Sequence, residues 1–533
     1  MIANRSTSTI TTVLGPVLVA GLCAGLTVSL TACLPTQKQP RTTPTGTANG
    51  AATTVASAGN PVKPDWRAAG IDWTAAPRSN EGMTFTPPAA QSFTLKNGAR
   101  VIVIENHRLP LVSIESLHLG AGSREDGKTA GLAALTADLL DEGAGSLTAD
   151  TLPEALERLG ASLEVSTGSD FSSITMSALT FDRAAELLGD VVQRPQFAAA
   201  DFERVKADRL EALALRKDRP RQIAALVFAR VVFGEHPYAK PTEGDPGTVK
   251  ALTLDAVKQF WTRAYNPQQA VFIVAGDVSS EQVRSKLETI FAGWSAKPSS
   301  SVAARRAPVA GPGRPMIAIV HRPDAPQSVV MIGRRSMAAG DDRYFTSEII
   351  NTALGGSFAS RLNQKLREEL GYTYGITSSF WRGRWGGTWT VASSIRSDVT
   401  VAGIEEALRI INDARSTAAS DNEWKKTQDL ITRGLPQNFE TNAGIVAAFH
   451  RVVLASGPLD WYQTFSNRIA TATPRHAQAL AATAWNDLSI VIVGDEAALT
   501  PHMSKLTALG LPIVKFNADG APLSPLPGLT TPK

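Results

Sequence analysis

Cysteine is nearly absent from this chain. Its 533 residues contain only Cys23 and Cys33, both near the N-terminus. A disulfide framework and a cysteine-rich metal site are therefore excluded for the rest of the sequence. Basic residues are not concentrated either, since 53 Lys and Arg face 49 Asp and Glu and no basic run occurs. This charge balance argues against a nucleic-acid partner, and 43% hydrophobic residues provide enough material for a globular core.

Histidine is scarce as well. The chain has seven His, none within four residues of another: His107, His118, His236, His321, His450, His476 and His502. The zinc motifs H-x-x-E-H and H-E-x-x-H both place two His four residues apart on one helical face. Because no two His of this chain have that spacing, neither motif is present. The G-x-S-x-G nucleophile motif and the P-loop are missing too. We expect these His to be structural and expect no cofactor on this chain; a relocated metal is the least favoured alternative.

The first residues have the pattern of an export signal. Arg5 precedes an apolar stretch over residues 10–30, and Leu30-Thr31-Ala32-Cys33 resembles a bacterial lipobox. We predict a lipoprotein-type signal peptide over 1–32, lipidation of Cys33, and a disordered tether over 33–85. An ordinary signal peptide and an uncleaved membrane helix are the alternatives. We therefore predict a lipid-anchored protein of the cell envelope that faces the periplasm. An Asp directly after the lipidated Cys is typical of retention in the inner membrane, and Leu34 stands there instead, which favours the outer membrane.

A duplicated pattern follows the tether. The predicted strands at Ser113 and Ser328 lie 215 residues apart, and the apolar strands ending at Gly276 and Gly494 lie 218 apart. A nearly constant offset indicates two copies of one unit. Strands come first in each copy, then helices, then a last strand, which is typical of an α+β fold. We predict an N-terminal module over 86–297, a flexible linker over 298–313, a C-terminal module over 314–520 and a disordered tail over 521–533.

Several stretches resemble the pitrilysin/insulinase family of zinc peptidases. They are Gly131-Leu132-Ala133 before a predicted helix ending at Glu142, Glu235-His236-Pro237-Tyr238, Tyr265-Asn266-Pro267, and Ser360-Arg361-Leu362. The resemblance implies two duplicated pitrilysin/mitochondrial-processing-peptidase-like modules, each an antiparallel-rich sheet with helices packed on it. It covers nearly all of the folded chain.

The zinc motif of that family is lost here. Active members carry H-x-x-E-H on the helix after Gly-Leu-Ala, with two His as ligands and the Glu as general base. The matching positions are Ala134, Leu135, Thr136, Ala137 and Asp138. Neither His nor Glu remains, so we expect no peptidase activity from this chain alone. The third ligand of the family comes from a later helix, where Glu203, Asp208 and Glu211 are the candidates; we expect them to form a solvated face.

The second module keeps a different family feature. Active members have an Arg and a Tyr seven residues apart that reach a zinc site in the other half, and Arg367 and Tyr374 have this spacing. Such donors suit an oxyanion at a tetrahedral centre. Tyr372 is the competing phenol, and the alternative makes Arg367 a helix-end cation and Tyr374 a core residue. Gly355-Gly356-Ser357 resembles a substrate-proximal turn, or else forms a tight connection between helices.

These features imply a divided enzyme. Some members of the family split into a zinc-bearing chain and a partner that lacks the motif but supplies surface and Arg/Tyr donors. We therefore predict a non-catalytic subunit of a heterodimeric envelope peptidase, with a zinc-bearing homologue and peptides as partners. The alternative is an envelope peptide-binding or scaffold protein with no peptidase role.

Overall fold

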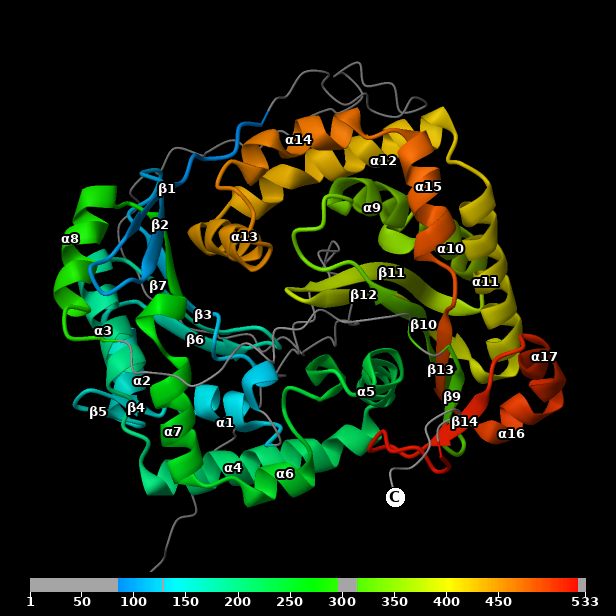
Figure 1. Ribbon diagram of the computed structural model, residues 1–533, viewed down its shortest axis with the longest axis horizontal. Coiled ribbons are helices and arrows are strands. Elements are labelled where there is room, and N and C mark those ends of the chain that lie inside the picture. The colour runs from blue at the N-terminus through cyan, green and yellow to red at the C-terminus, as the bar shows by residue number, and fades with distance from the viewer. Residues whose placement is uncertain (1–84, 127–128, 296–312, 314, 526–533) are drawn as a thin grey trace, which may run out of the picture. The chain divides into compact units, whose positions relative to one another are not determined.

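The computed structural model describes residues 85–126, 129–295, 313 and 315–525. These residues form two six-stranded sheets with helices packed on them (Figure 1). The predicted signal peptide, Cys33, the tether up to residue 84 and most of the predicted linker lie outside the described residues. In the part of the chain that is described, no helix has the length and hydropathy needed to cross a membrane.

The N-terminal sheet has the strand order β1-β2-β8-β3-β7-β6. Its strands are β1 (Gln91–Thr94), β2 (Arg100–Glu105), β3 (Val112–His118), β6 (Ser162–Thr167), β7 (Ser172–Ala178) and β8 (Ala270–Gly276), beside a small hairpin of β4 (Gly143–Ala144) and β5 (Leu147–Thr148). Only β2 and β8 pair in parallel. The apolar run of β8 is buried at every position, which is why this strand lies inside the sheet.

The helices of the N-terminal module fill the long connections between these strands. They are α1 (Leu132–Asp138), α2 (Thr151–Arg158), α3 (Phe181–Gln193), α4 (Ala199–Leu215), α5 (Pro220–Phe233), α6 (Pro246–Ala251), α7 (Leu254–Ala264) and α8 (Ser280–Ile290), with the short 3-10 helices η1 (Ser123–Asp126) and η3 (Pro237–Ala239). Most of them present one apolar face to the sheet, as α3 does with Phe181, Leu188 and Val192.

The C-terminal sheet repeats the arrangement with the order β11-β12-β10-β13-β9-β14. Its strands are β9 (Ile317–His321), β10 (Gln327–Ser336), β11 (Thr373–Gly383), β12 (Gly386–Arg396), β13 (Ser489–Gly494) and β14 (Ile513–Phe516). Its helices are α9 (Tyr344–Asn351), α10 (Arg361–Asn363), α11 (Thr400–Ser416), α12 (Asp421–Gly434), α13 (Asn442–Leu454), α14 (Trp461–Thr471), α15 (Pro474–Ala484), α16 (Glu496–Leu499) and α17 (Met503–Ala508), with the π-helices η6 (Thr352–Gly356) and η7 (Gln364–Glu369). Strands β9, β13, β10, β12 and β11 occupy the places of β2, β8, β3, β7 and β6, so the predicted α+β fold of two related modules is confirmed.

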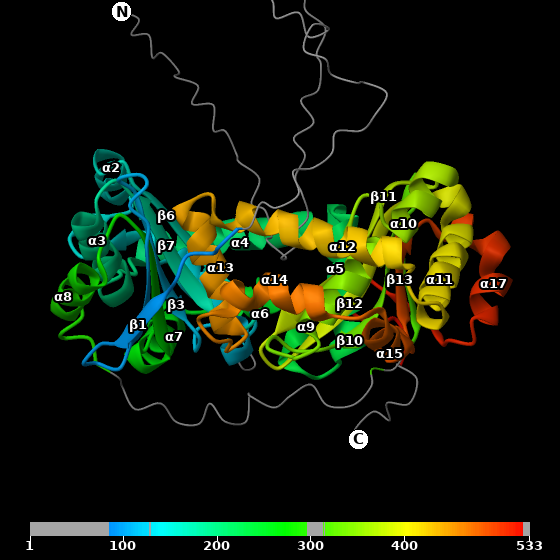
Figure 2. The same cartoon turned by 90° about the horizontal axis from the view of Figure 1, so that it is seen from above.

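One helix of each module packs on the sheet of the other. Helix α5 contacts β10 and β13, and its Val227 and Phe228 share a buried cluster with Val491 of the C-terminal sheet. Helix α13 contacts β3 and β8, and Phe449 belongs to a buried cluster that includes Ile273 of β8. Figures 1 and 2 show α13 beside β3 and α5 beside β13. Burial of apolar side chains is the main source of folding free energy, so this exchange ties the two modules together.

Two details differ from the sequence prediction. The helix predicted to end at Glu142 is α1 and ends at Asp138, where the chain turns; Gly131, with a φ of 95°, precedes its first residue, Leu132. At the other end, Leu523 donates its N–H to Lys515 at 2.8 Å and Pro522 forms a bridge with Phe516. The first residues of the tail predicted to be disordered therefore pair with β14.

Candidate functional site

A buried carboxylate fixes the N-terminus of α1, the helix that matches the metal-binding helix of active relatives. Asp126 accepts the backbone N–H of Gly131 at 2.8 Å and that of Ala133 at 2.7 Å. Burial raises the pKa of Asp126 to about 7, although both bonds favour its ionised form. A Cβ on Gly131 would lie 2.9 Å from the Glu243 carbonyl oxygen, so the turn into α1 requires glycine.

The former ligand positions carry no groups that can hold zinc. Ala134 and Ala137 are 4% and 2% exposed, and their methyl groups cannot bind a metal or move a proton. Asp138 is ion-paired with Arg209 of α4, while burial raises its pKa and Arg209 opposes that rise. A guanidinium beside the single carboxylate repels a divalent cation. The residues at this site therefore do not fit zinc.

The acids of α4 do not complete a metal site. Glu203, Asp208 and Glu211 are all exposed, which is the solvated face that the sequence predicts. The α4 side chain that reaches α1 is Arg209, and the sequence analysis missed it because it considered only acids on this helix. Among the described residues, no group of three or more His, Cys, Asp and Glu side chains is close enough together to hold a metal ion.

Strand β6 offers a backbone edge next to this helix. It is the outermost strand of the N-terminal sheet, pairs with β7, and is in contact with α1. Leu163 and Val165 point toward the core, while Ser162, Glu164 and Ser166 are exposed. An edge strand of this kind can pair with an extended peptide through backbone hydrogen bonds.

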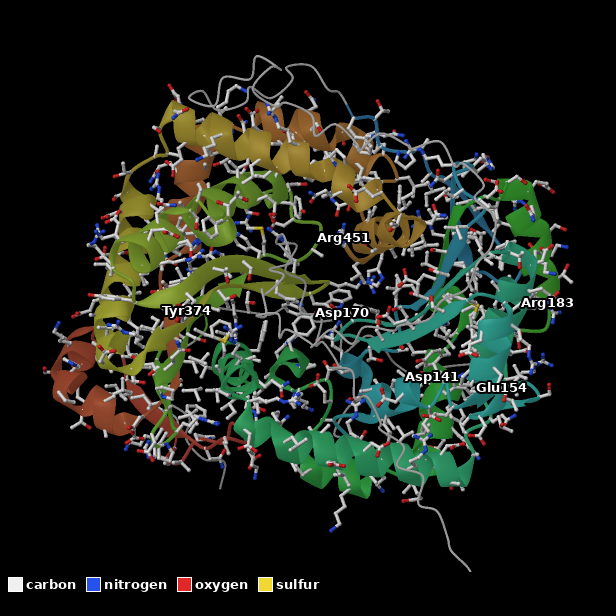
Figure 3. The ribbon with its side chains drawn as sticks, turned by 180° about the vertical axis from the view of Figure 1, so that it is seen from behind. Asp141, Glu154, Asp170, Arg183, Tyr374 and Arg451 are labelled. Atoms are coloured by element: carbon white, nitrogen blue, oxygen red, sulfur yellow. The ribbon has the colours of Figure 1, made fainter. Side chains whose placement is uncertain are left out.

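Strand β11 is the corresponding edge of the C-terminal sheet, and Tyr374 lies on it (Figure 3). The Tyr374 side chain is 90% exposed, so the alternative that placed it in a core is wrong. Tyr372, by contrast, is partly buried against the C-terminal core. The exposure favours Tyr374 as the phenol that could reach another molecule.

Arg367 lies in the last turn of η7, just before β11. Its guanidinium stacks over the ring of Phe358 at 4.4 Å, and its Nε lies 3.4 Å from Glu368. Arg367 is one-third exposed and Phe358 is 64% exposed, which leaves this end of η7 open to a partner or peptide.

The predicted substrate-proximal turn, Gly355-Gly356-Ser357, is explained by packing. A Cβ on Gly355 would lie 2.8 Å from the Ser378 backbone nitrogen of β11, and one on Gly356 would lie 3.1 Å from the Asn351 carbonyl oxygen. Ser357 Oγ donates to the Thr352 carbonyl at 3.1 Å. The close approach of backbones thus accounts for both glycines. A contact of this turn with substrate remains a prediction.

The sequence analysis missed a buried polar network between the modules. The Tyr238 hydroxyl lies 2.8 and 2.7 Å from the two oxygens of Asp170, and Arg124 Nη1 donates to Asp170 at 3.3 Å. From the β11–β12 turn, Arg384 donates its backbone N–H to Asp170 at 2.9 Å, and Trp385 donates its own to the Tyr238 hydroxyl at 3.2 Å. Burial, together with Asp170, raises the pKa of Tyr238. Figure 3 labels Asp170 at this junction.

One signal for this network was in the sequence. Tyr238 ends the Glu235-His236-Pro237-Tyr238 stretch that resembles the peptidase family. Nothing in the spacing indicated that a turn of the other module would supply the remaining donors. Arg384 lies 214 residues from Asp170 along the chain, and Trp385 lies 147 residues from Tyr238.

Two family models match the chain in adjacent segments. The model described as "Insulinase (Peptidase family M16)" matches residues 100–245, and the one described as "Peptidase M16 inactive domain" matches residues 251–431. The chain belongs to the M16 family of peptidases. The first match contains Ala134, Ala137 and Asp138, so this M16 chain is a homologue without the family's metal motif, consistent with a non-catalytic role.

Individual relatives include proteins named as peptidases and one named as a non-peptidase. An "uncharacterized zinc protease" of Mycobacterium bovis is 30% identical over 54% of this chain and 66% of its own length, slightly under two thirds. The "non-peptidase homolog YmxG" of Helicobacter pylori is 25% identical over 75% of this chain and 93% of its own. A crystal structure titled as a peptidase M16 inactive domain from Pseudomonas fluorescens has a TM-score of 0.71 at 23% identity, covering 76% of this chain and 98% of that one. The last comparison shows the fold.

Proposed function

We propose that this M16 chain is the non-catalytic subunit of a heterodimeric peptidase of the cell envelope. It binds peptide at its sheet edges and supplies Arg367 and Tyr374 to a zinc site held by a homologous partner. The observation that carries this proposal is the contrast between two sites in one chain. At the former zinc position Asp138 is ion-paired with Arg209, whereas Tyr374 keeps a side chain that is 90% exposed.

The chemistry of the exposed pair supports this role. A phenol and a guanidinium donate hydrogen bonds and can stabilise the oxyanion that forms when water adds to a peptide carbonyl. Neither group needs a metal on its own chain to do this. Arg367 is already held by stacking on Phe358, which reduces the conformational freedom it would lose on binding.

Reconstitution tests the proposal. The purified chain is mixed with a zinc-bearing M16 homologue from the same organism, and cleavage of a quenched fluorescent peptide is followed. We expect the mixture to cleave and each chain alone to be inactive or far slower. Arg367→Ala should lower the rate of the mixture, while Arg396→Ala, which removes an exposed Arg paired with Asp398, should not. A mixture that stays inactive, or whose cleavage rate is unchanged by Arg367→Ala, would overturn the proposal.

A peptide-binding or scaffold protein without a catalytic partner is the second candidate. Its support is that β6 and β11 are edge strands in a chain whose metal site is lost. Pull-down from the native organism distinguishes the two, because the subunit model requires a zinc-bearing M16 homologue in the complex. A reading frame for such a homologue next to this one would favour the subunit model.

Anchoring by a lipid on Cys33 is part of the proposal. The sequence Leu30-Thr31-Ala32-Cys33 supports it, and the fold beginning near residue 86 leaves a long segment between the anchor and the body. Mass spectrometry of the N-terminal peptide from membranes should show a diacylglyceryl-modified Cys33. Cys33→Ser should carry no lipid and should keep residues 1–32 uncut; a wild-type protein whose Cys33 carries no lipid would contradict the anchor.

A further inference from the structure

Strand β11 carries one extra residue at the place where Tyr374 lies. The register of β11 with β12 shifts between Thr373 and Ile376, so Tyr374 and Gly375 both lie opposite the single residue Ser394. Two residues that face one on the neighbouring strand form a β-bulge, which interrupts the ladder of backbone hydrogen bonds. Bulges are frequent beside active sites, where they redirect a side chain.

The bulge decides to which face of the sheet Tyr374 belongs. Side chains alternate between the two faces of a strand, and Ile376, Ser378 and Phe380 are buried on one of them. An uninterrupted alternation would place Tyr374 on that same buried face. Because of the extra residue, Thr373 lies there instead and is 8% exposed, whereas Tyr374 is 90% exposed. The bulge is therefore the reason why the phenol is accessible.

Two buried hydroxyl groups hold the bulge. Thr373 Oγ1 accepts the backbone N–H of Gly375 at 3.1 Å and donates to the Ser394 carbonyl oxygen at 2.8 Å. Ser393 Oγ lies 3.0 Å from the Gly375 carbonyl oxygen and 2.9 Å from Thr373 Oγ1. The side chains of Thr373 and Ser393 are each 8% exposed. These bonds provide partners for backbone groups that the bulge takes out of the ladder.

We propose that this bulge positions the Tyr374 hydroxyl for the reaction, with Thr373 and Ser393 as positioning residues that act through it. An oxyanion donor contributes only when it lies within hydrogen-bond distance of the place where negative charge develops. The bulge sets the face and direction of the side chain before a partner binds, which lowers the conformational freedom lost on binding. This inference rests on the role of Tyr374 in the proposed function and extends it to buried residues.

Deletion of Gly375 tests the inference, because it removes the extra residue from β11. Thr373 and Ile376 keep their partners on β12, and Tyr374 then faces Ser394 alone, so its side chain stays on the exposed face in an altered direction. In the reconstituted peptidase we expect kcat to fall by about tenfold or more with KM within about twofold, since a shift of about 1 Å can cost about 100-fold. The midpoint of urea unfolding should not fall, because the deletion completes the ladder.

Two further variants show whether the deletion acts through the phenol. Gly375→Ala keeps the number of residues, and its methyl group meets no atom within 4 Å outside its chain neighbours, so its kcat should lie well above that of the deletion variant. Deletion of Gly375 combined with Tyr374→Phe should lower kcat no further than Tyr374→Phe alone. The hydroxyl that the deletion displaces is already absent in that background.

The Thr373 hydroxyl gives a second, independent test. Thr373→Val removes the hydroxyl at nearly the same size and should lower kcat, because the Gly375 N–H and the Ser394 carbonyl lose their partner. Thr373→Ser keeps the hydroxyl and should recover the wild-type kcat. This pair of variants decides the inference if the deletion variant does not fold.

The outcomes separate this inference from the proposed function. A deletion variant with unaltered kcat, or one that lowers kcat equally in the wild-type and Tyr374→Phe backgrounds, overturns the inference and leaves the subunit role standing. If the deletion variant does not fold, a wild-type kcat for Thr373→Val overturns it in the same way. A wild-type mixture that does not cleave peptide overturns the subunit role and this inference together.

Discussion

The Arg209 guanidinium of α4 is ion-paired with the Asp138 carboxylate of α1, at the last position of the stretch that binds zinc in active relatives. This ion pair joins α1 and α4, so the two helices are held together without a metal. Ala134 and Ala137 are buried on α1, so the helix keeps its packing without the metal.

Removal of Arg209 should have an effect that depends on pH. Burial raises the pKa of Asp138 and Arg209 opposes it, so Arg209→Ala raises that pKa further. At pH 7 the variant should lose up to about 1 kcal/mol of unfolding free energy, a modest value because Asp138 is partly exposed. At pH 4 the loss should shrink, since protonated Asp138 needs no counter-ion. Urea unfolding at both pH values measures this, and Arg158→Ala, an exposed pair with Glu154, is the control. An equal loss at both pH values would contradict the account.

Asp126 should make the protein less stable as the pH rises from 4 to 7. Its folded pKa is about 7, and the unfolded value is about 3.9, so in this window the folded state holds a proton that the unfolded state has released. Stability from this group is complete below pH 4 and is lost as the pH passes 7, with a slope of up to about 1.4 kcal/mol per pH unit. Asp126→Asn should flatten that slope, as measured by denaturant unfolding from pH 4 to 8. An unchanged slope would show that another group controls it.

His450 should contribute far more to the free energy of unfolding than an exposed His in a similar pair. Its Nδ1 lies 2.7 Å from Glu115 Oε1 between α13 and β3, and the Glu115 side chain is only 4% exposed. His450→Ala leaves that carboxylate buried without a partner and should cost about 3–5 kcal/mol of unfolding free energy. His107→Ala, whose pair with Asp277 is exposed, should change little. Adding Glu115→Gln to His450→Ala should recover part of the loss; no recovery would mean that packing, not charge, dominates.

Because α5 and α13 each pack on the sheet of the other module, we predict that cutting the chain between the modules will not separate them. Cleavage at a protease site inserted between residues 298 and 312 should leave both pieces in one complex on size-exclusion chromatography, because α5 and α13 each pack on the other module's sheet. Phe228→Ala should weaken this complex and cost about 3–5 kcal/mol of unfolding free energy. Pieces that elute separately without denaturant would contradict the packing.

Local patterns in the sequence predicted much of the fold, because apolar periodicity and turn residues act over short distances. The strands predicted at Ser113 and Ser328 are β3 and β10, and the apolar strands predicted to end at Gly276 and Gly494 are β8 and β13. Periodicity shows that a helix has an apolar face but not which sheet covers it, so the exchange of α5 and α13 could not be predicted.

The candidate site, too, could be predicted from the sequence only in part. The loss of the zinc ligands at Ala134 and Ala137 was readable from residue types alone, because a methyl group cannot bind a metal. The pairing of Asp138 with Arg209 and that of Asp170 with Arg384 depend on contacts between distant segments, separated by 71 and 214 residues. Such contacts follow from the packing of whole elements, which a single sequence does not specify.

The central claim is that this chain supplies donors to a zinc site on a partner, and the turnover number of the reconstituted peptidase with Tyr374→Phe tests it most directly. The substitution removes one hydroxyl from a side chain that is 90% exposed, so folding should be unaffected. We expect kcat to fall by about 100-fold or more, as for loss of an oxyanion donor, while Tyr372→Phe stays within about twofold of the wild type. An unchanged kcat for Tyr374→Phe in an active mixture would contradict the account.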